Sequence, residues 1–355
     1  MASSYKTKIE SYLEVVLSQG ASDLHITVGK PPSIRVDARL FPIEGEVELD
    51  EKGTEGLIKA LLDEEQLAKY IKNRQLDFSY SYQDKARFRV NVFFQKGTYA
   101  AALRLIPKKI FTLEELGLPE TVAEFTDHSQ GFVLIVGPTG HGKTTTLVSL
   151  VNLINKTREE HIITIEDPIE YTFPHEKCMV AQREIYDDAH SFADALKASL
   201  REDPDVVLVG EMRDLETISS ALTIAETGHL VFSTLHTNDA AQTIDRIIDV
   251  FPPHQQNQIK IQLAGSLLGI VSQRLVPRIG GGRVPVVEVL KVNSAVKNLI
   301  REGKTHQINN IIQTGAEEGM IPLNKSLAEL VQNEIVTEED AFAYTNNQRD
   351  LKSLL

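Results

Sequence analysis

The segment GPTGHGKT, at residues 137–144, constrains the fold of this chain more than any other stretch of the sequence. It matches the pattern G-x-x-x-x-G-K-[ST], and it stands between the apolar run GFVLIV (131–136) and the helix-compatible run LVSLVNLI (147–154). This strand–loop–helix context is the one in which the pattern marks a phosphate-binding loop. The segment therefore predicts an α/β fold with a nucleotide site at the end of a buried strand.

The residue types of this loop suit a nucleoside triphosphate and Mg²⁺. Glycines let the backbone wrap so that successive N–H groups converge on phosphate oxygens, and the helix N-terminus adds positive potential. Lys143 is expected to reach the β- and γ-phosphates, and Thr144 to place its hydroxyl on Mg²⁺. The predicted nucleotide-binding residues are Gly137, Pro138, Thr139, Gly140, His141, Gly142, Lys143, Thr144 and Thr145.

Further apolar runs follow the loop at intervals typical of a doubly wound sheet. Nearly continuous apolar runs predict strands buried on both faces, as in parallel sheets. The runs are HIITIED (161–167), DVVLVGE (205–211) and HLVFSTLH (229–236), and the helical segments between them are 143–155, 191–200 and 214–226. From about residue 238 onward we expect a mostly helical chain.

Polar residues stand at the ends of these predicted strands. Glu166 and Asp167 end the first run, Glu211 the second and His236 the third. A doubly wound sheet gathers its chemistry at the carboxyl ends of its strands, so these side chains should lie near the phosphate loop. A carboxylate there can order Mg²⁺-bound water or orient the attacking water, and a histidine can contact the γ-phosphate. The simpler alternatives are loop charges and a structural histidine.

The N-terminal third of the chain has a different pattern. Helical spacing over 5–19 predicts a helix, and 54–73 predicts one or two surface helices. Alternation predicts antiparallel strands over 33–40 (with Ala38 on the inner face), 76–82 and 88–94. The expected organisation is an N-terminal domain over 1–106, a linker over 107–119, and an ATPase domain over 120–355 with its core at 120–275 and a mainly helical part at 276–355.

Composition limits the possible partners. The net charge is −13, which disfavours nucleic acid because an acidic chain repels polyphosphate. The single cysteine, Cys178, excludes an internal disulfide and a multi-cysteine zinc site, and it fits a reducing compartment. No apolar run approaches the roughly 18 residues of a membrane span, and the N-terminus lacks a signal-peptide apolar region. We expect a cytoplasmic protein that reaches a membrane only through a partner.

These motifs, in this order, resemble those of the secretion-type hexameric ATPases of type IV pili and type II secretion. The resemblance covers nearly the whole chain. It rests on GASDLHITVGKPPSIRVDARL (20–40), RFRVNVFFQKGTYAAALRLIP (87–107), GPTGHGKTTT (137–146), IEDPIEY (165–171), LREDPDVVLVGEMRD (200–214) and TGHLVFSTLHTNDA (227–240). The segment SAVKNLIREGKTHQINNIIQTG (294–315) is similar to a signature of the pilus-retraction branch, with Val296 and Lys297 where that branch has Ile and Arg.

The resemblance implies a PAS-like α+β domain followed by a RecA-like P-loop NTPase core with a helical C-terminal tail. It implies a homohexameric ring that hydrolyses ATP with Mg²⁺. The residues it implies for catalysis are Glu166, Glu211, His236, Arg89 and Arg104, with Arg201 and Arg213 as further candidates. Mg²⁺ would be held by Thr144, with Glu211 through water. Whether Glu166 or Glu211 is the principal base stays open.

The implied function is a motor that drives type IV pilus retraction and twitching motility. Its partners would be the pilus machinery and an inner-membrane platform protein, which would place the protein at the inner membrane from the cytoplasmic side. The alternatives are an accessory retraction paralogue and an ATP-switched scaffold on the platform. A nucleic-acid translocase on the same core is disfavoured by the charge of −13.

Overall fold

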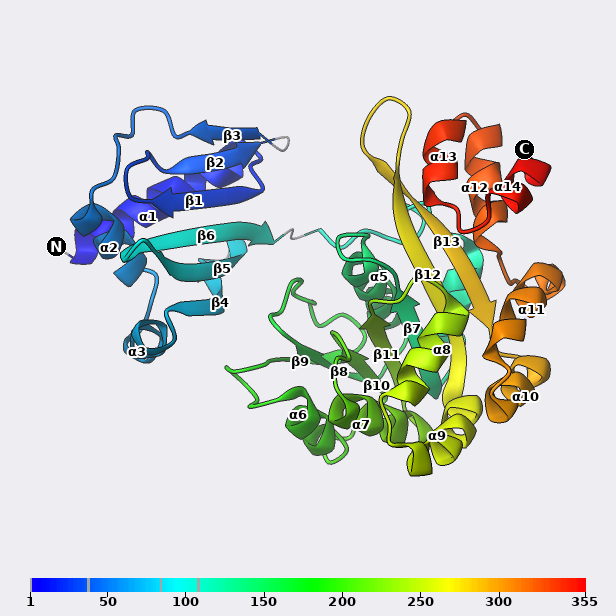
Figure 1. Ribbon diagram of the computed structural model, residues 1–355. Coiled ribbons are helices and arrows are strands. Elements are labelled where there is room, and N and C mark those ends of the chain that lie inside the picture. Colours follow the sequence, from blue (N-terminus) through cyan, green and yellow to red (C-terminus); the bar gives the residue numbers. More distant parts are fainter. Residues whose placement is uncertain (1, 37–38, 84, 107–108) are drawn as a thin grey trace. The chain divides into compact units, whose positions relative to one another are not determined.

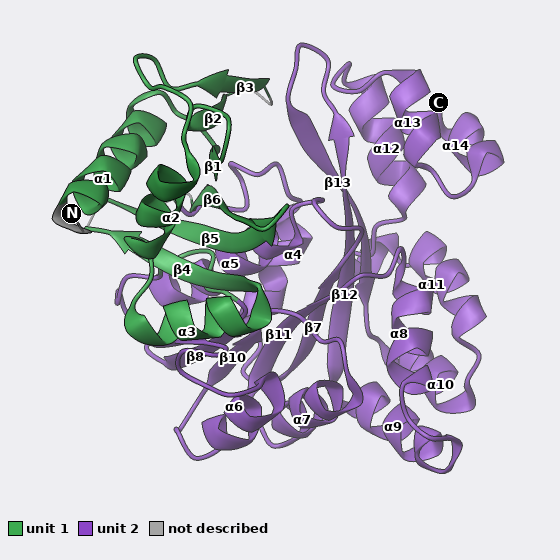
Figure 2. Cartoon of the chain, turned by 60° about the vertical axis from the view of Figure 1, so that its left-hand side comes forward, with its two compact units in different colours: residues 1–109, 168–172 green, residues 110–167, 173–355 purple. Residues whose placement is uncertain are grey.

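The computed structural model describes residues 2–36, 39–83, 85–106 and 109–355. The chain forms two compact units, one of residues 1–109 and 168–172 and the other of residues 110–167 and 173–355 (Figure 2). Each unit has its own sheet and its own hydrophobic core. Ala38, expected in a strand, and Pro107 and Lys108, expected in the linker, lie outside the described residues.

The first unit is a six-stranded antiparallel sheet with three helices (Figure 1). The strand order is β3-β2-β1-β6-β5-β4. The strands are β1 (Asp23–Thr27), β2 (Ser33–Val36), β3 (Arg39–Pro42), β4 (Gln75–Tyr82), β5 (Ala86–Gln95) and β6 (Thr98–Ile106), and the helices are α1 (Ala2–Ser18), α2 (Glu51–Lys59) and α3 (Glu64–Asn73). The predicted α+β character of this region is confirmed. The apolar residues of α1 and of the inner sheet face form one core.

One strand prediction in this unit is wrong. Residues 33–40 were expected to form a single strand, but β2 and β3 are two antiparallel strands, with Ser33 opposite Pro42. The chain reverses between them, so the alternating residues separate onto two strands. Ile34 is buried on β2, whereas Leu40 is 52% exposed on the edge strand β3.

The second unit is a seven-stranded sheet flanked by helices. The strand order is β13-β12-β7-β11-β10-β8-β9. The strands are β7 (Gly131–Val136), β8 (His161–Glu166), β9 (Met179–Glu184), β10 (Val206–Val209), β11 (Leu230–Leu235), β12 (Leu267–Pro277) and β13 (Arg283–Lys291). Every residue of β7, β10 and β11 is buried, and these strands pair in parallel, as the continuous apolar runs predict. The α/β fold class is therefore confirmed.

The helices of this unit alternate with the parallel strands and then form the C-terminal part. They are α4 (Glu120–Ala123), α5 (Lys143–Thr157), α6 (Phe192–Ser199), α7 (Leu215–Glu226), α8 (Ala240–Asp249), α9 (Pro253–Ser266), α10 (Ser294–Glu302), α11 (Ile308–Thr314), α12 (Leu323–Gln332), α13 (Glu338–Tyr344) and α14 (Gln348–Leu354). In Figure 1, α10 to α14 lie along the β12–β13 side of the sheet. Apolar residues of α12, α13 and α14 form a small core with Val276 of β12 and Val286 of β13.

The expectation of a mostly helical chain after about residue 238 is wrong for residues 267–291. These residues form the hairpin of β12 and β13, which joins the sheet because β12 pairs in parallel with β7. Both strands are rich in β-branched residues, which favour extended backbone. The connection contains Gly280, Gly281 and Gly282, which have φ angles of 88°, 105° and 78° and so occupy a region that glycine adopts without strain. The hairpin places β12 directly beside the strand that leads into the phosphate loop.

Candidate active site

The phosphate loop joins β7 to α5 through backbone that requires glycine. Gly137, Gly140 and Gly142 have φ angles of 147°, 78° and 80°. A Cβ atom at Gly137 would lie 2.2 Å from the main-chain oxygen of Gln273 on β12, so no side chain fits there. The loop is thus held tightly against its neighbouring strand. Its glycines leave backbone N–H groups uncovered by side chains, as a phosphate cradle needs.

Lys143 is the first residue of α5, and its side chain folds back over the loop. Its ammonium donates to the main-chain oxygens of Gly137 at 2.8 Å and Pro138 at 3.0 Å. Lys143 is 7% exposed, and burial lowers the pKa of its ammonium, although the charge of Glu211 opposes this effect. A buried ammonium over the loop suits a polyphosphate site, because the negative charge of a bound phosphate would compensate for the hydration that the ammonium loses on burial.

His236 connects the loop to the end of a neighbouring strand. Its Nδ1 lies 3.2 Å from Thr139 Oγ1 and 3.3 Å from Lys143 Nζ, and its Nε2 lies 3.0 Å from Glu211 Oε1. An ammonium can only donate, so Nδ1 accepts, and the protonated Nε2 donates a hydrogen bond to the Glu211 carboxylate. The structure therefore brings four residues predicted from the sequence into one hydrogen-bonded group.

Glu211 follows β10, whose end is tied to β11. Thr234 donates its hydroxyl to the main-chain oxygen of Gly210 at 2.7 Å, and the N–H of Met212 donates to the main-chain oxygen of Thr234 at 3.2 Å. The second carboxylate oxygen of Glu211 accepts from Arg213 at 2.7 Å. Burial raises the pKa of Glu211, but the hydrogen bonds from Arg213 and His236, together with the charge of Arg213, outweigh it and hold the pKa below its usual range. The side chain is therefore a carboxylate at neutral pH.

Glu166 ends β8 in a more enclosed setting. It is 4% exposed, and its Oε1 accepts from Thr164 Oγ1 at 2.6 Å and from Gln182 Nε2 at 3.1 Å. These partners belong to β8 and to the edge strand β9. The two acids thus differ: Glu211 is linked through His236 to Lys143, whereas Glu166 accepts hydrogen bonds from side chains of β8 and β9.

The remaining loop residues take different positions. Thr144 and Thr145 are half-buried on the first turn of α5. The side chain of His141 turns towards β12, where its Nδ1 accepts the N–H of Leu275 at 2.9 Å. Burial, together with the charges of Arg283, Lys143 and Arg274, lowers the pKa of His141, which favours the neutral ring that this bond requires.

The predicted arginines Arg89 and Arg104 belong to the first unit. They lie opposite each other in the paired strands β5 and β6. Arg104 donates from Nε to Asp23 at 3.0 Å, and its side chain is 73% exposed. Burial raises the pKa of Asp23, but hydrogen bonds from Ser22 and Arg104 outweigh it, so the net shift is downward. Arg89 forms an ion pair with Glu170 at 3.7 Å.

The other arginine candidates flank β10 in the second unit. Arg213 is bound to Glu211, and Arg201 is exposed beyond α6. No motif in the sequence pointed to Gln273, whose side chain contacts the loop from β12. A strand there could have been found from the β-branched residues and the three glycines of the hairpin, but its pairing with β7 depends on the tertiary structure.

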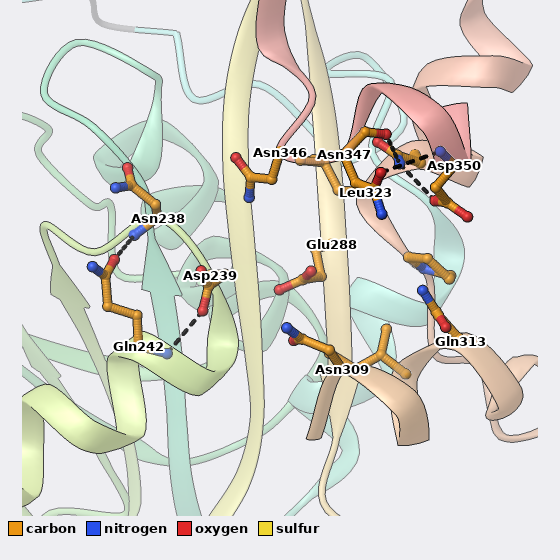
Figure 3. A pocket seen from close by; sticks show the side chains of 13 residues that line it. Asn238, Asp239, Gln242, Glu288, Asn309, Gln313, Leu323, Asn346, Asn347 and Asp350 are labelled. Carbon is orange, nitrogen blue, oxygen red and sulfur yellow. Dashed lines mark hydrogen bonds between the residues drawn. The ribbon is translucent and has the colours of Figure 1, made fainter. Parts of the chain in front are cut away.

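A polar cavity of about 400 Å³ lies elsewhere in the second unit, against β13 (Figure 3). Figure 3 shows Asn238 and Gln242 on one side, Asn309 below, Asn346 above and Glu288 of β13 between them. No lysine or arginine is among the described residues that line it. Its amides and carboxylates do not suit phosphate, so we assign the nucleotide site to the loop.

Comparison with known proteins identifies the family of this chain. The family model described as "Type II/IV secretion system protein" matches residues 3–281. The chain is 46% identical over 333 residues to the type IV pilus retraction ATPase PilT of Pseudomonas aeruginosa, covering 94% of this chain and 96% of that protein. It is 39% identical over 349 residues to the type IV pilus ATPase PilU of the same organism, covering 98% of this chain and 91% of that protein.

A solved structure gives the same result for the fold. The crystal structure of the pilus retraction motor PilT with bound ADP matches with a TM-score of 0.92 and 46% identity, covering 97% of this chain and 98% of that chain. The two sheets described above, of an N-terminal and a RecA-like domain, are the fold of that protein. With its phosphate loop, its strand-end residues and these relatives, this chain belongs to the type II/IV secretion system protein family.

Proposed function

We propose that this chain is a motor ATPase that drives type IV pilus retraction. The observation that carries the proposal is the hydrogen-bonded series from Lys143 through His236 to Glu211 beside a glycine-built phosphate loop. It joins a cation for the phosphates to a carboxylate that stays ionised. The same chain is 46% identical to a protein named as a pilus retraction ATPase over 94% of its length.

The residues of the site have different roles in phosphoryl transfer. The N–H groups of the loop bind the phosphates, and Lys143 exchanges its loop carbonyls for the β- and γ-phosphate oxygens. Thr144 and Glu211 offer hydroxyl and carboxylate oxygens, the hard donors that Mg²⁺ prefers, so they would hold the ion. Mg²⁺, when bound, neutralises charge that develops on the phosphate oxygens. Glu211 or Glu166 orients the attacking water.

His236 gives this site a way to sense what the loop holds. Its Nδ1 faces Thr139 and Lys143, and its Nε2 donates to Glu211. If a γ-phosphate draws Lys143 away, the Nδ1 of His236 loses one hydrogen-bond donor. The imidazole can then shift, and its hydrogen bond to Glu211 changes with it. The histidine therefore links nucleotide state to the end of β10.

A ring of six identical subunits would complete the site with arginines supplied in trans. Arg104 donates from Nε to Asp23, and its side chain is 73% exposed. A guanidinium fixed at Nε presents the other two nitrogens as a fork that suits phosphate. Arg89 stands beside it on β5. In this proposal, residues 1–106 supply the arginines, 107–119 are the linker and 120–355 bind ATP.

The partners would be the pilus machinery and its inner-membrane platform protein, met from the cytoplasmic side. Among the residues that the structure describes, no helix combines the length and apolar character needed to cross a membrane. Contact with the membrane would then be made through the platform.

A gene deletion tests the proposal. Cells that lack the protein should be hyperpiliated and should not twitch, and the Lys143→Ala protein should not restore motility. Restoration by Lys143→Ala would favour a scaffold without turnover. The 39% identity to PilU over 98% of the chain supports one alternative, an accessory retraction ATPase. Normal twitching after deletion, with slower retraction only under load, would favour that role.

A further inference from the structure

The side-chain amide of Gln273 lies against the phosphate loop and is 2% exposed. Its Nε2 donates to the main-chain oxygen of His141 at 2.8 Å, and its Oε1 accepts from Thr146 Oγ1 at 2.7 Å. Because Gln273 is on β12 and Thr146 is on the first turn of α5, one side chain joins the loop and the following helix to the neighbouring strand.

The same strand approaches the loop at further points. Besides the close approach at Gly137, a Cβ atom at Gly142 would lie 2.9 Å from the Nε2 of Gln273. The N–H of Leu275 donates to His141 Nδ1 at 2.9 Å. From β13, Arg283 donates to the main-chain oxygen of Gly140 at 3.2 Å. The hairpin therefore contacts the loop along its length.

The carbonyl that Gln273 holds belongs to the peptide unit between His141 and Gly142. In a planar trans peptide the C=O and N–H bonds point in opposite directions. Anchoring the His141 carbonyl on Gln273 therefore directs the Gly142 N–H away from β12. Phosphate loops bind through successive N–H groups, and a rotated peptide would present a carbonyl oxygen in place of a donor.

We propose that Gln273 is a positioning residue of the nucleotide site, which fixes the 141–142 peptide from β12 in the orientation that binds phosphate. It acts through the backbone and does not touch the nucleotide. On the opposite face of β12, Arg274 donates to the main-chain oxygen of Tyr344 and to Asn346 Oδ1. The strand that positions the loop is thereby also bonded to the C-terminal helical part. The inference rests on the proposed ATPase function.

The test compares two substitutions that each remove part of the same hydrogen-bonded group. Gln273→Met keeps the side-chain volume and removes both bonds, whereas Thr146→Val removes only the bond that does not involve the loop peptide. Affinity for MgADP is measured by calorimetry, and KM and kcat for ATP by phosphate release. Thermal unfolding without nucleotide confirms that each variant is folded. If Gln273→Met does not fold, Gln273→Asn replaces it, because one methylene fewer draws the amide back from the His141 carbonyl.

We expect the Gln273 variant to bind MgADP about tenfold more weakly and to show a similar rise in KM, with kcat changed less than about threefold. Thr146→Val should stay within about twofold of the wild type in both constants. The proposal is overturned if the folded Gln273 variant binds MgADP as the wild type does, or if Thr146→Val weakens binding equally. Calorimetry measures MgADP binding without turnover. A wild-type protein that binds MgADP but hydrolyses no ATP would therefore refute the proposed function, whereas the role of Gln273 would still be tested by the MgADP affinities of the variants.

Discussion

His236 Nε2 lies 3.0 Å from Glu211 Oε1, and Nδ1 of the same ring lies 3.3 Å from Lys143 Nζ. One imidazole thus connects the acid after β10 to the cation at the start of α5. Three segments that are far apart in the sequence meet at this ring. This contact distinguishes Glu211 from the other candidate acid, Glu166, and it leads to separate expectations for their substitution.

Lys143→Ala should lower ATP turnover by on the order of 10³-fold or more, because the charge facing the β- and γ-phosphates is lost. The variant should remain folded, since among the described residues the ammonium forms its hydrogen bonds with loop carbonyls and His236 and ties no distant element of the fold together except through that ring. Steady-state phosphate release measures the loss, and circular dichroism checks the fold. Near-normal hydrolysis by folded Lys143→Ala protein would contradict the assignment of the phosphate loop.

Glu211→Gln should bind ATP with nearly wild-type affinity and hydrolyse it about 10²-fold more slowly, because an amide cannot orient water as a carboxylate does. Glu166→Gln should also reduce turnover. It should keep its unfolding temperature, because both hydrogen bonds go to one oxygen, Oε1, and the amide oxygen of glutamine can accept both. Nucleotide binding, turnover and thermal unfolding are measured for both variants. An acid whose amide variant keeps full turnover has no place in the catalytic site.

Arg104→Ala should be nearly inactive although its own phosphate loop is intact, because the arginine would serve a neighbouring subunit. Rings mixed with Lys143→Ala subunits should recover part of the activity, since some interfaces then pair an intact loop with an intact arginine. Phosphate release is measured after mixing at several ratios, and native mass spectrometry verifies the mixed rings. Verified mixed rings without recovery would count against a role in trans.

The stability of the nucleotide-free protein should fall as pH decreases below about 6.5, partly through His141. Burial and the nearby charges of Arg283, Lys143 and Arg274 lower its pKa from the usual 6.5. Below pH 6.5 the unfolded chain binds a proton at His141 more readily than the folded protein does, because the pKa is lower in the folded state. The contribution of His141 to the free energy of unfolding is therefore complete above pH 6.5 and is lost as the pH falls through the folded pKa. His141→Gln, which can still accept from Leu275, should flatten this dependence in denaturant titrations. An unchanged slope would show that His141 titrates alike in both states.

Substitutions in α10 should separate ATP hydrolysis from pilus retraction. On the apolar face of α10, Val296 and Ile300 are fully buried and Leu299 packs against the same core, whereas Ala295 is exposed. Arg301 is exposed and bonded only to Asn298 among the described residues. If this surface contacts the pilus machinery, Arg301→Ala should keep ATP turnover and abolish twitching.

A matched substitution on the buried face provides the control for α10. Ile300→Ala should cost about 2–4 kcal/mol of unfolding free energy and reduce ATP turnover and motility together. Lys297→Ala, half-buried on the same helix, is expected to behave as Arg301→Ala does. Proportional loss of turnover and twitching in the two charge variants would show that α10 only supports the fold.

Features that depend on neighbouring residues could be predicted from the sequence. The glycines of the loop, the buried run before it and the helix after it each lie within a short segment, so their spacing specified a phosphate loop in an α/β fold. The acids and the histidine at the strand ends followed because parallel strands place their carboxyl ends at one edge of the sheet.

Which of these residues come into contact, and whether Gln273 joins them, depends on how the strands assemble in the folded chain. The β12–β13 hairpin reaches the phosphate loop because β12 pairs with β7 across more than a hundred residues, and no local pattern encodes that pairing. The same holds for Glu166 and Glu211, which look alike in the sequence but differ in burial and in their partners. Local periodicity selects helix or strand, whereas the burial of apolar surface over the whole chain selects which strands become neighbours.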